Sequence, residues 1–403
     1  MKKSSIFCHR PLFAIGLAAG VLAPGRAAEA DLREVIHDDF TFAAAQYTQL
    51  LAQVKGDPQL PRTFANGKVV TVAPEDWTSG FFPGALWLVY DYTRDAKWRT
   101  AAEDYTARLA AIQNLTKHHD VGFMLYCSYG QGLRLTGNPV YRDVLLQGAK
   151  SLSTRFNPAV GAIRSWDNQT WKYPVIIDNM MNLELLMWAA RAGPAPRGRE
   201  IAISHADKTL GNHFRADGSS FHLVDYDPAT GAAVKKQTVQ GAADGSAWAR
   251  GQAWGLYGFT MMYRETRNPA YLAQAEKIAR FLLSHPRLPE DKVPYWDYDA
   301  PGIPDEPRDT SAAAIMCSAL IELSDFAEPE LARQCLAVAE RQLRSLSSPA
   351  YRAPLGTNGN FLLMHGVGHK PGKSEIDQPL IYGDYYFLEA LLRFRAKLTA
   401  AAK

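Results

Sequence analysis

Cysteine is scarce in this chain, which has four among its 403 residues. Cys8 lies near the N-terminus, and Cys127, Cys317 and Cys335 each stand among apolar residues. The sequence has no Cys-x-x-Cys pair and no other close metal-ligand spacing. This pattern is not typical of a disulfide scaffold or a zinc site, so we expect the last three cysteines to lie in the core.

A membrane-spanning apolar run is also missing. The apolar stretch at 12–22 has about eleven residues, whereas a transmembrane helix needs about 20. Lys2 and Lys3 precede this stretch, and the small residues Ala28 and Ala30 follow it, as in a secretory signal peptide. We therefore expect a signal peptide at 1–30, export to a bacterial periplasm, and a single domain over 31–403.

Net charge is absent once this leader is set aside. The whole chain has 44 basic and 41 acidic residues, and the leader removes four basic residues and one acidic residue, which leaves 40 of each. A neutral protein has no long-range field that would attract nucleic acid or an anionic membrane surface. We therefore expect neither partner, and the composition indicates no particular oligomeric state.

Long runs of alternating apolar and polar residues are absent too, which argues against an extensive sheet. Apolar residues instead recur three and four positions apart, and Gly and Pro mark the boundaries. The pattern predicts twelve helices, at 31–54, 80–94, 97–115, 120–136, 139–155, 179–192, 198–213, 249–266, 269–284, 310–326, 328–346 and 383–398. Short connections make sequence neighbours antiparallel pairs.

These helices are of two kinds. Segments such as 97–115 and 328–346 mix charged and apolar residues, as half-exposed helices do. Segments such as 120–136 and 310–326 have few charges and are rich in Gly, Ala, Met and aromatic residues, as covered helices are. The alternation of outer and inner helices predicts an all-α fold, an (α/α)6 barrel of six hairpins.

Six polar and aromatic clusters open the predicted inner helices and would gather at one mouth of the barrel. They lie at 76–80, 119–122, 178–182, 246–250, 309–311 and 383–386. Three long segments, at 214–248, 285–309 and 350–378, would form loops or small hairpins. The sequence therefore predicts a walled pocket at one end of the barrel.

The aspartates in these clusters have two interpretations. An Asp just before a helix is often an N-cap, and we expect this role for Asp309 and Asp384. Asp120 and Asp178 begin successive inner helices, and two carboxylates held close together raise the pKa of one of them. The second interpretation predicts one proton donor near neutral pH.

Aromatic residues accompany these aspartates in the same clusters. Core filling explains Trp77, Trp248 and Trp254 equally well, but an aromatic pocket with convergent carboxylates favours sugar chemistry, because Trp and Tyr stack on pyranose faces. No other His lies at a metal-ligand spacing from His119, so we expect no metal and no cofactor.

Six motifs occur in an order that resembles the unsaturated glucuronyl hydrolases, glycoside hydrolase family 88. They are DWTSGFFPG at 76–84, HDVGF at 119–123, DNMMN at 178–182, WARGQAWG at 248–255 after Gln240-Gly241, DTSA at 309–312 and GDYYF at 383–387. The resemblance spans essentially the whole of 31–403 and implies an (α/α)6 barrel. It also implies an oligosaccharide substrate of glycosaminoglycan type that a polysaccharide lyase has produced. The terminal uronic acid of this substrate carries a C4=C5 double bond.

The resemblance further implies roles for individual residues. Asp178 would be the general acid that protonates C4 and then, as a base, helps water to add at C5, with Asp120 essential beside it. The predicted substrate-binding residues are His119, Trp77, Gln240, Trp248, Arg250, Trp254, His222 and Lys370. Arg250 would pair with the uronate carboxylate.

Some alternatives stay open at this point. A lone histidine such as His222 is uninformative by itself. The segment 365–373 lacks the clustered serines of some sulfate-accepting members, so Lys370 would meet either sulfate or, as we favour, solvent. The whole chain could instead be an unsaturated rhamnogalacturonyl hydrolase, a retaining or inverting glycosidase, or a non-catalytic toroid that only binds sugars.

Overall fold

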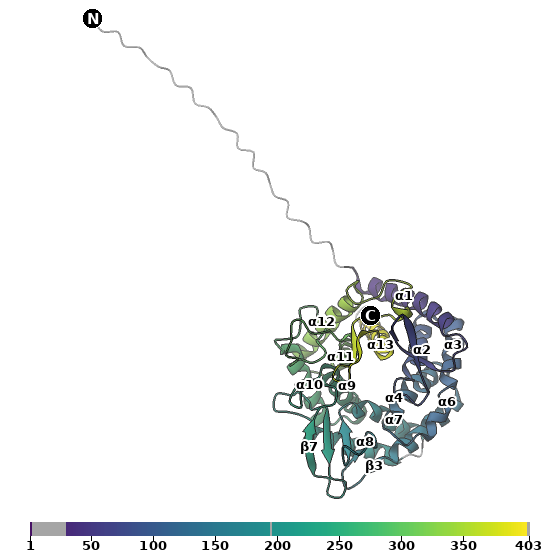
Figure 1. The fold of residues 1–403 in the computed structure, drawn as a ribbon, viewed down its shortest axis with the longest axis vertical. Coiled ribbons are helices and arrows are strands. Elements are labelled where there is room, and N and C mark those ends of the chain that lie inside the picture. Colours follow the sequence, from purple (N-terminus) through teal and green to yellow (C-terminus); the bar gives the residue numbers. More distant parts are fainter. Residues whose placement is uncertain (2–29, 194–195, 401–403) are drawn as a thin grey trace. The chain divides into compact units, whose positions relative to one another are not determined.

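The helices of the chain alternate between two concentric layers (Figure 1). The computed structural model describes Met1 and residues 30–193 and 196–400, so the predicted leader at 1–30 lies almost wholly outside the described residues. Residues Leu32–Lys403 form one unit. Among the helices of the described residues, none is both long and apolar enough to cross a bilayer.

The inner layer consists of helices that pack against one another in sequence order. They are α2 (Phe81–Thr93), α4 (Val121–Leu125) with its continuation α5 (Gln131–Thr136), α7 (Asn179–Ala192), α9 (Ala249–Thr266), α11 (Thr310–Leu323) and α13 (Ile381–Ala400). The last of these, α13, packs against α2 as well as α11, so the ring is closed. The predicted (α/α)6 barrel is confirmed.

The outer layer covers this ring, each helix packing against its inner neighbour. It consists of α1 (Leu32–Gln53), α3 (Ala96–Ala107), α6 (Pro139–Ser153), α8 (Pro196–Asn212), α10 (Pro269–Ser284) and α12 (Pro329–Leu346). Every residue of α11 is buried, whereas α12 buries only one face. This is the difference that the two kinds of helical sequence predicted.

Two inner helices, α4 and α7, begin without the side-chain caps that most outer helices have. Side chains cap the starts of four outer helices: Asp95 caps α3, Asn138 caps α6, Asn268 caps α10 and Glu328 caps α12. At the starts of α4 and α7, by contrast, Asp120 and Asp178 make no such bond. The capping interpretation therefore fails for these two carboxylates, which are free for another purpose.

Small antiparallel hairpins interrupt the helices. Three of the four sheets are hairpins: β1–β2 (Leu60–Ala65, Lys68–Val72), β3–β4 (Phe156–Asn157, Ala162–Ile163) and β8–β9 (Gly366–His369, Ser374–Gln378). The fourth sheet joins β5 (Pro174–Ile176), β6 (Leu223–Tyr226) and β7 (Ala233–Gln237). The hairpins in the segments 214–248 and 350–378 agree with the prediction, but β1–β2 was missed.

The segment 120–136 was predicted as one long helix, but it is not a continuous α-helix. It is broken by a π-helical turn, η2 (Tyr126–Gly130), between α4 and α5. The segment predicted as one helix at 97–115 likewise ends as α3 at Ala107 and continues as the 3-10 turn η1 (Ala110–Asn114). Cys127, Cys317 and Cys335 are free and buried, as predicted.

Close packing of α4 on α7 sets the separation of the two helix starts that carry Asp120 and Asp178. Gly122 permits this approach, because a Cβ atom at this position would lie 2.5 Å from the Cα atom of Asn182. The neighbour in this contact is backbone, which cannot rotate away.

We therefore expect Gly122→Ala to lower the free energy of unfolding by about 1–3 kcal/mol, through overpacking. Thermal and denaturant unfolding would measure this effect. The matched control is Gly211→Ala in α8, where nothing lies within 4 Å of the added Cβ atom. The control should be neutral or slightly stabilising, since Ala favours helix over Gly. Equal stability of the two variants would contradict the packing argument.

Candidate active site

Asp178 is held at one rim of the barrel by the small sheet that precedes α7. Strand β5 ends at Ile176, and the N–H of Ile177 donates to the carbonyl of His222 at 2.9 Å, just before β6 begins. Asp178 follows directly and is 8% exposed. The sheet therefore places the carboxyl group and the imidazole of His222 side by side.

His222 faces Asp178 with a nitrogen that carries a proton. Its Nδ1 accepts hydrogen bonds from the backbone N–H groups of Val239 and Gln240 at 3.0 and 3.3 Å, so the proton is on Nε2. That Nε2 lies 3.7 Å from Oδ2 of Asp178, and neither atom has another protein partner. Burial lowers the pKa of His222 to about 3, so the imidazole is a neutral donor.

Asp178 itself holds a proton near neutral pH. Burial raises the pKa of this carboxyl group from 3.8 to about 7. The positive charge of Arg250 opposes that rise, and the negative charge of Asp120 adds to it. The sequence predicted a shift in this direction from the carboxylate pair, but desolvation is the larger cause.

Asp120 is ionised, in contrast to Asp178. Two consecutive histidines flank its carboxylate, with Nδ1 of His118 3.4 Å from Oδ2 and Nε2 of His119 3.3 Å from Oδ1. Burial raises the pKa of Asp120, but the two histidines and Asn182 outweigh this effect and leave the pKa below its ordinary value. The rim therefore has one buried acid and one partly buried carboxylate.

Sequence reasoning missed His118 as a site residue. Its Nε2 donates to the carbonyl of Glu75 at 3.1 Å, which turns Nδ1 toward Asp120. Its hydrogen bond to Asp120 raises the pKa of His118 against the opposing effect of burial. His119, by contrast, is 1% exposed, and burial lowers its pKa to about 4. The run His118-His119-Asp120 was the available signal, but a single sequence did not separate the two histidines.

Arg250 is buried beside Trp248 and is hydrogen-bonded to the hairpin β8–β9. Its Nη1 donates to Oδ2 of Asp309 at 3.1 Å and to the carbonyl of Val367, and its Nη2 donates to the carbonyl of Gly368. The side chain is 1% exposed, and Nε has no protein partner. Arg250 thus holds the hairpin in place, while its Nε–H and one N–H of Nη2 have no protein acceptor.

Asp309 is a helix cap, as predicted. Its Oδ1 accepts from the backbone N–H of Ser311 at 3.0 Å, and its Oδ2 pairs with Arg250. Asp384 is not a cap, which corrects the prediction. Helix α13 begins earlier, at Ile381, so Asp384 lies in the first turn. It accepts from the backbone N–H groups of Leu362 and Leu363, at 2.8 and 3.0 Å, and so holds that loop.

The predicted tryptophans form two groups. The ring of Trp248 lies 4.7 Å from that of His222 and 4.5 Å from the guanidinium carbon of Arg250, so it belongs to the wall beside Asp178. Trp254 is completely buried, and Phe123 lies between it and the half-buried Trp77, at 5.0 and 5.7 Å between ring centroids. The indole of Trp254 also lowers the pKa of Asp178, although no hydrogen bond of ordinary geometry joins them.

Gln240 and Lys370 belong to the surrounding loops. Nε2 of Gln240 donates to the carbonyl of Gly368 at 3.0 Å, which ties the 238–247 segment to β8. The side chain of Lys370 is 30% exposed. Its ammonium pairs with Glu306 and lies 5.2 Å from the ring of Trp296. Lys370 is thus partly exposed and held by Glu306, and the choice between sulfate and solvent stays a prediction.

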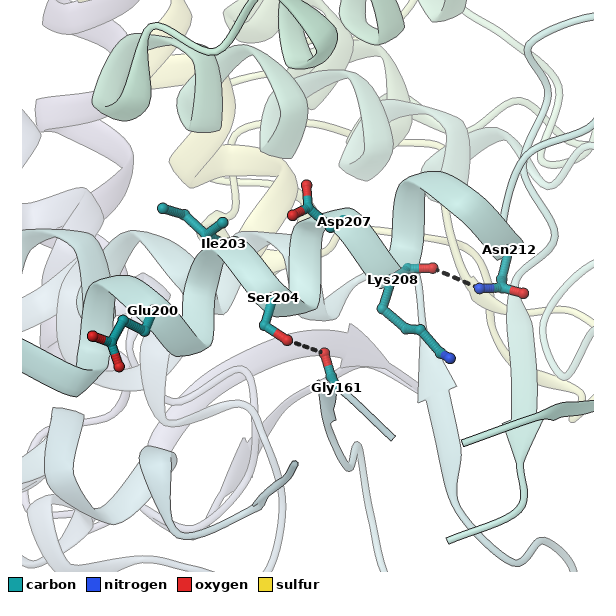
Figure 2. Close-up of a pocket in the computed structure, with 7 residues that line it drawn as sticks. All are labelled: Gly161, Glu200, Ile203, Ser204, Asp207, Lys208 and Asn212. Atoms are coloured by element: carbon teal, nitrogen blue, oxygen red, sulfur yellow. Dashed lines mark hydrogen bonds between the residues drawn. The ribbon is translucent and has the colours of Figure 1, made fainter. Parts of the chain in front are cut away.

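An outer groove of about 600 Å³ is unrelated to this rim (Figure 2). It runs along α8, where Ser204 donates to the carbonyl of Gly161 at 2.9 Å and Asn212 donates to that of Lys208. None of the predicted site residues lines it. Within the described residues, no group of three or more His, Cys, Asp or Glu side chains could hold a metal ion.

A closed helical barrel with a protonated carboxyl group, an ionised partner and an aromatic wall at one rim is suited to acid–base chemistry on a sugar, as in an (α/α)6 glycosidase. The family model for Glycosyl Hydrolase Family 88 matches residues 58–386. The chain belongs to this family.

Similar proteins agree with that assignment. An unsaturated glucuronyl hydrolase from Formosa agariphila is 45% identical over 86% of this chain and 88% of its own length. A crystal structure of an unsaturated glucuronyl hydrolase specific for heparin is 44% identical, with a TM-score of 0.88 over 91% of this chain and 98% of that one. A crystal structure of a mutant unsaturated glucuronyl hydrolase from Streptococcus agalactiae, complexed with dGlcA-GalNAc6S, is 30% identical, with a TM-score of 0.75 over 90% of this chain and 92% of that one.

Proposed function

We propose that this glycoside hydrolase releases the 4,5-unsaturated glucuronyl residue from lyase-generated oligosaccharides, by hydrating the C4=C5 vinyl ether. The observation that carries the proposal is the buried Asp178, whose pKa of about 7 lies far above that of an ordinary carboxyl group. Protonation of carbon requires an acid that is still protonated at working pH. The named activities of the similar proteins support the same substrate class.

In the proposed mechanism, Asp178 donates its proton to C4, and the positive charge that develops is shared between C5 and the ring oxygen. The resulting carboxylate then accepts a proton from water as that water adds to C5. The product is a hemiketal, which opens and releases the rest of the oligosaccharide. The Nε2–H of His222 is available to donate a hydrogen bond to the carboxylate or to the substrate.

Other residues of the rim have supporting roles in this proposal. The ionised Asp120 keeps the proton on Asp178, and His118 and His119 keep Asp120 ionised. The unshared N–H groups of Arg250 are the donors for the uronate carboxylate. Trp77 and Trp248 supply aromatic surface for the sugar rings.

A direct assay tests the proposal. The purified protein is incubated with unsaturated disaccharides from heparin, chondroitin, hyaluronan and rhamnogalacturonan, and the ultraviolet absorbance of the conjugated double bond is followed. We expect this absorbance to fall with at least one of the glycosaminoglycan disaccharides. Activity on the rhamnogalacturonan product alone would favour the rhamnogalacturonyl alternative. Unchanged absorbance with all four would refute hydrolysis and leave a sugar-binding toroid.

We also propose that the chain is exported to the periplasm. The supporting observations are Lys2 and Lys3, the apolar stretch at 12–22 and the small residues at Ala28 and Ala30. N-terminal sequencing of the protein from a periplasmic extract should find a start at or near Asp31. A full-length protein confined to the cytoplasm would contradict this proposal.

A further inference from the structure

A second cavity lies at the opposite end of the barrel from Asp120 and Asp178. It has a volume of about 680 Å³, within the usual range for small-molecule sites. Its lining comes from α2, α5, α7, α9 and α13, together with the π-helical turn η2. Asp178 directly precedes α7, and the lining residues Glu184 and Trp188 lie six and ten residues later, about 9 and 15 Å along the helix.

Buried aromatic side chains close the barrel between the two ends. Trp254 and Tyr386 lie 5.4 Å apart, Phe123 lies 5.0 Å from Trp254, and Phe81 lies 5.9 Å from Tyr386. All four are at most 2% exposed. A sugar in the catalytic rim therefore cannot reach the second cavity through the barrel, and the two spaces are separate sites.

Two aromatic rings form one corner of the second cavity. Tyr126 and Trp188 are both half-buried, and their ring centroids lie 6.3 Å apart at an angle of 52°. Tyr126 is the first residue of η2. Single π-helical turns within α-helices occur frequently at functional sites, because the extra residue changes the direction in which side chains point.

Hydrogen bonds between the polar groups around this corner fix the orientation of their side chains. Gln131 donates to the hydroxyl of Tyr385 at 3.0 Å and accepts from Nε of Arg134 at 2.9 Å, and Arg134 pairs with Asp91. On the other side, Glu389 accepts from Ser318 and from Tyr257, at 2.5 and 3.2 Å. These groups are therefore oriented before any ligand binds, and each guanidinium or carboxylate retains N–H groups or lone pairs for further hydrogen bonds.

The fixed charges of the lining balance. Three carboxylates and three guanidinium groups face the cavity, and they belong to Asp91, Glu184, Glu389, Arg134, Arg393 and Arg395. A site without net charge attracts neither an anion nor a cation at long range. The catalytic rim differs from it, because Arg250 there keeps unshared donors for a carboxylate.

We propose that this cavity is a second carbohydrate site for a neutral pyranose saccharide. We call it the base cavity, and its lining includes Tyr126, Trp188, Gln131, Arg134 and Glu389. The faces of Tyr126 and Trp188 would stack on the C–H surface of a sugar ring. The oriented Gln131, Arg134 and Glu389 groups would exchange hydrogen bonds with its hydroxyl groups. The site is independent of the proposed hydrolysis, since the catalytic residues lie at the other end of the barrel.

Saturation-transfer NMR with lactose and with chitobiose at millimolar concentration tests the proposal. We expect transfer from the wild-type protein, and an affinity about tenfold lower or weaker still in Trp188→Ala, since stacking is lost. The matched variant Trp77→Ala, at the catalytic rim, should bind these neutral sugars like the wild type. Glucuronate should fail to compete for the base cavity. Turnover of unsaturated disaccharides should be unchanged in Trp188→Ala.

Three results would overturn the proposal: no transfer to either sugar, transfer that depends on Trp77 instead of Trp188, or equal competition by glucuronate. Arg134→Ala is the second variant, in case Trp188→Ala does not fold, because its side chain is half exposed and lies at the edge of the cavity. It should weaken binding severalfold by removing an oriented donor, and wild-type affinity in a folded Arg134→Ala protein would count against the site.

Discussion

Asp178→Asn should lower the turnover of unsaturated disaccharides by about a thousandfold or more and leave the barrel folded. The amide has the same shape as the carboxyl group but cannot give up a proton to C4, and general acid–base catalysis typically contributes about 10²–10⁴-fold. The stability should not fall, because Oδ2 of Asp178 has no hydrogen-bond partner to lose. The rate and the thermal unfolding midpoint are measured on the same preparation.

Asp384→Asn is the matched control for this variant. Burial raises the pKa of Asp384 to about 7, as it does for Asp178, but its oxygens accept from Leu362, Leu363 and Tyr47. The amide supplies one acceptor oxygen for these donors, so the control should lose about 1–3 kcal/mol of stability while its folded fraction stays active. Full activity in Asp178→Asn would move the acid role elsewhere, and Asp120 would be the next candidate.

Asp120→Asn should produce the second large effect, a shift in the pH dependence of kcat/KM. In the wild type, Asp178 must be protonated to act, so kcat/KM should fall about tenfold per pH unit above about pH 7. The negative charge of Asp120 raises the pKa of Asp178, and removal of that charge lowers it. The descending limb should therefore move to lower pH, with a large loss of activity at pH 7 and a smaller loss at pH 5.

A profile of kcat/KM between pH 4 and 9 measures this shift. Asp305→Asn, on an exposed loop, is the control for the loss of one negative charge and should leave the profile in place. An Asp120→Asn profile that is lowered equally at every pH would mean that Asp120 positions the substrate and does not govern the proton on Asp178.

The fold was largely predictable because its periodicity is local. The inner helices are apolar on nearly all sides and the outer ones on one side, so α11 and α12 could be assigned to their layers from composition. The hairpin β1–β2 was missed although Asn66-Gly67, a strong turn signal, lies at its tip with positive φ at both residues. The π-helical turn in 120–136 leaves no comparable signal, since its residues continue the apolar pattern.

Most residues of the site were predictable, but the relative size of the effects that act on them was not. Asp120 and Asp178 were identified as a pair, yet the raised pKa of Asp178 comes mainly from burial, which depends on how β5, β6 and α7 pack. Likewise Arg250 was expected to pair with the uronate carboxylate, but its hydrogen bonds to β8 and to Asp309 were not predicted. Contacts between residues more than a hundred positions apart, such as Arg250 and Gly368, are not written in a single sequence.

The closure of α13 on α2 has a consequence for how the protein is made. A ribosome completes α2 some three hundred residues before it completes α13, and until then the inner faces of α2 and α11 lack their cover. Incomplete chains with exposed apolar surface are prone to aggregation. A premature stop within 381–391, where most residues of α13 are buried, should therefore yield a degraded product and no partially active enzyme.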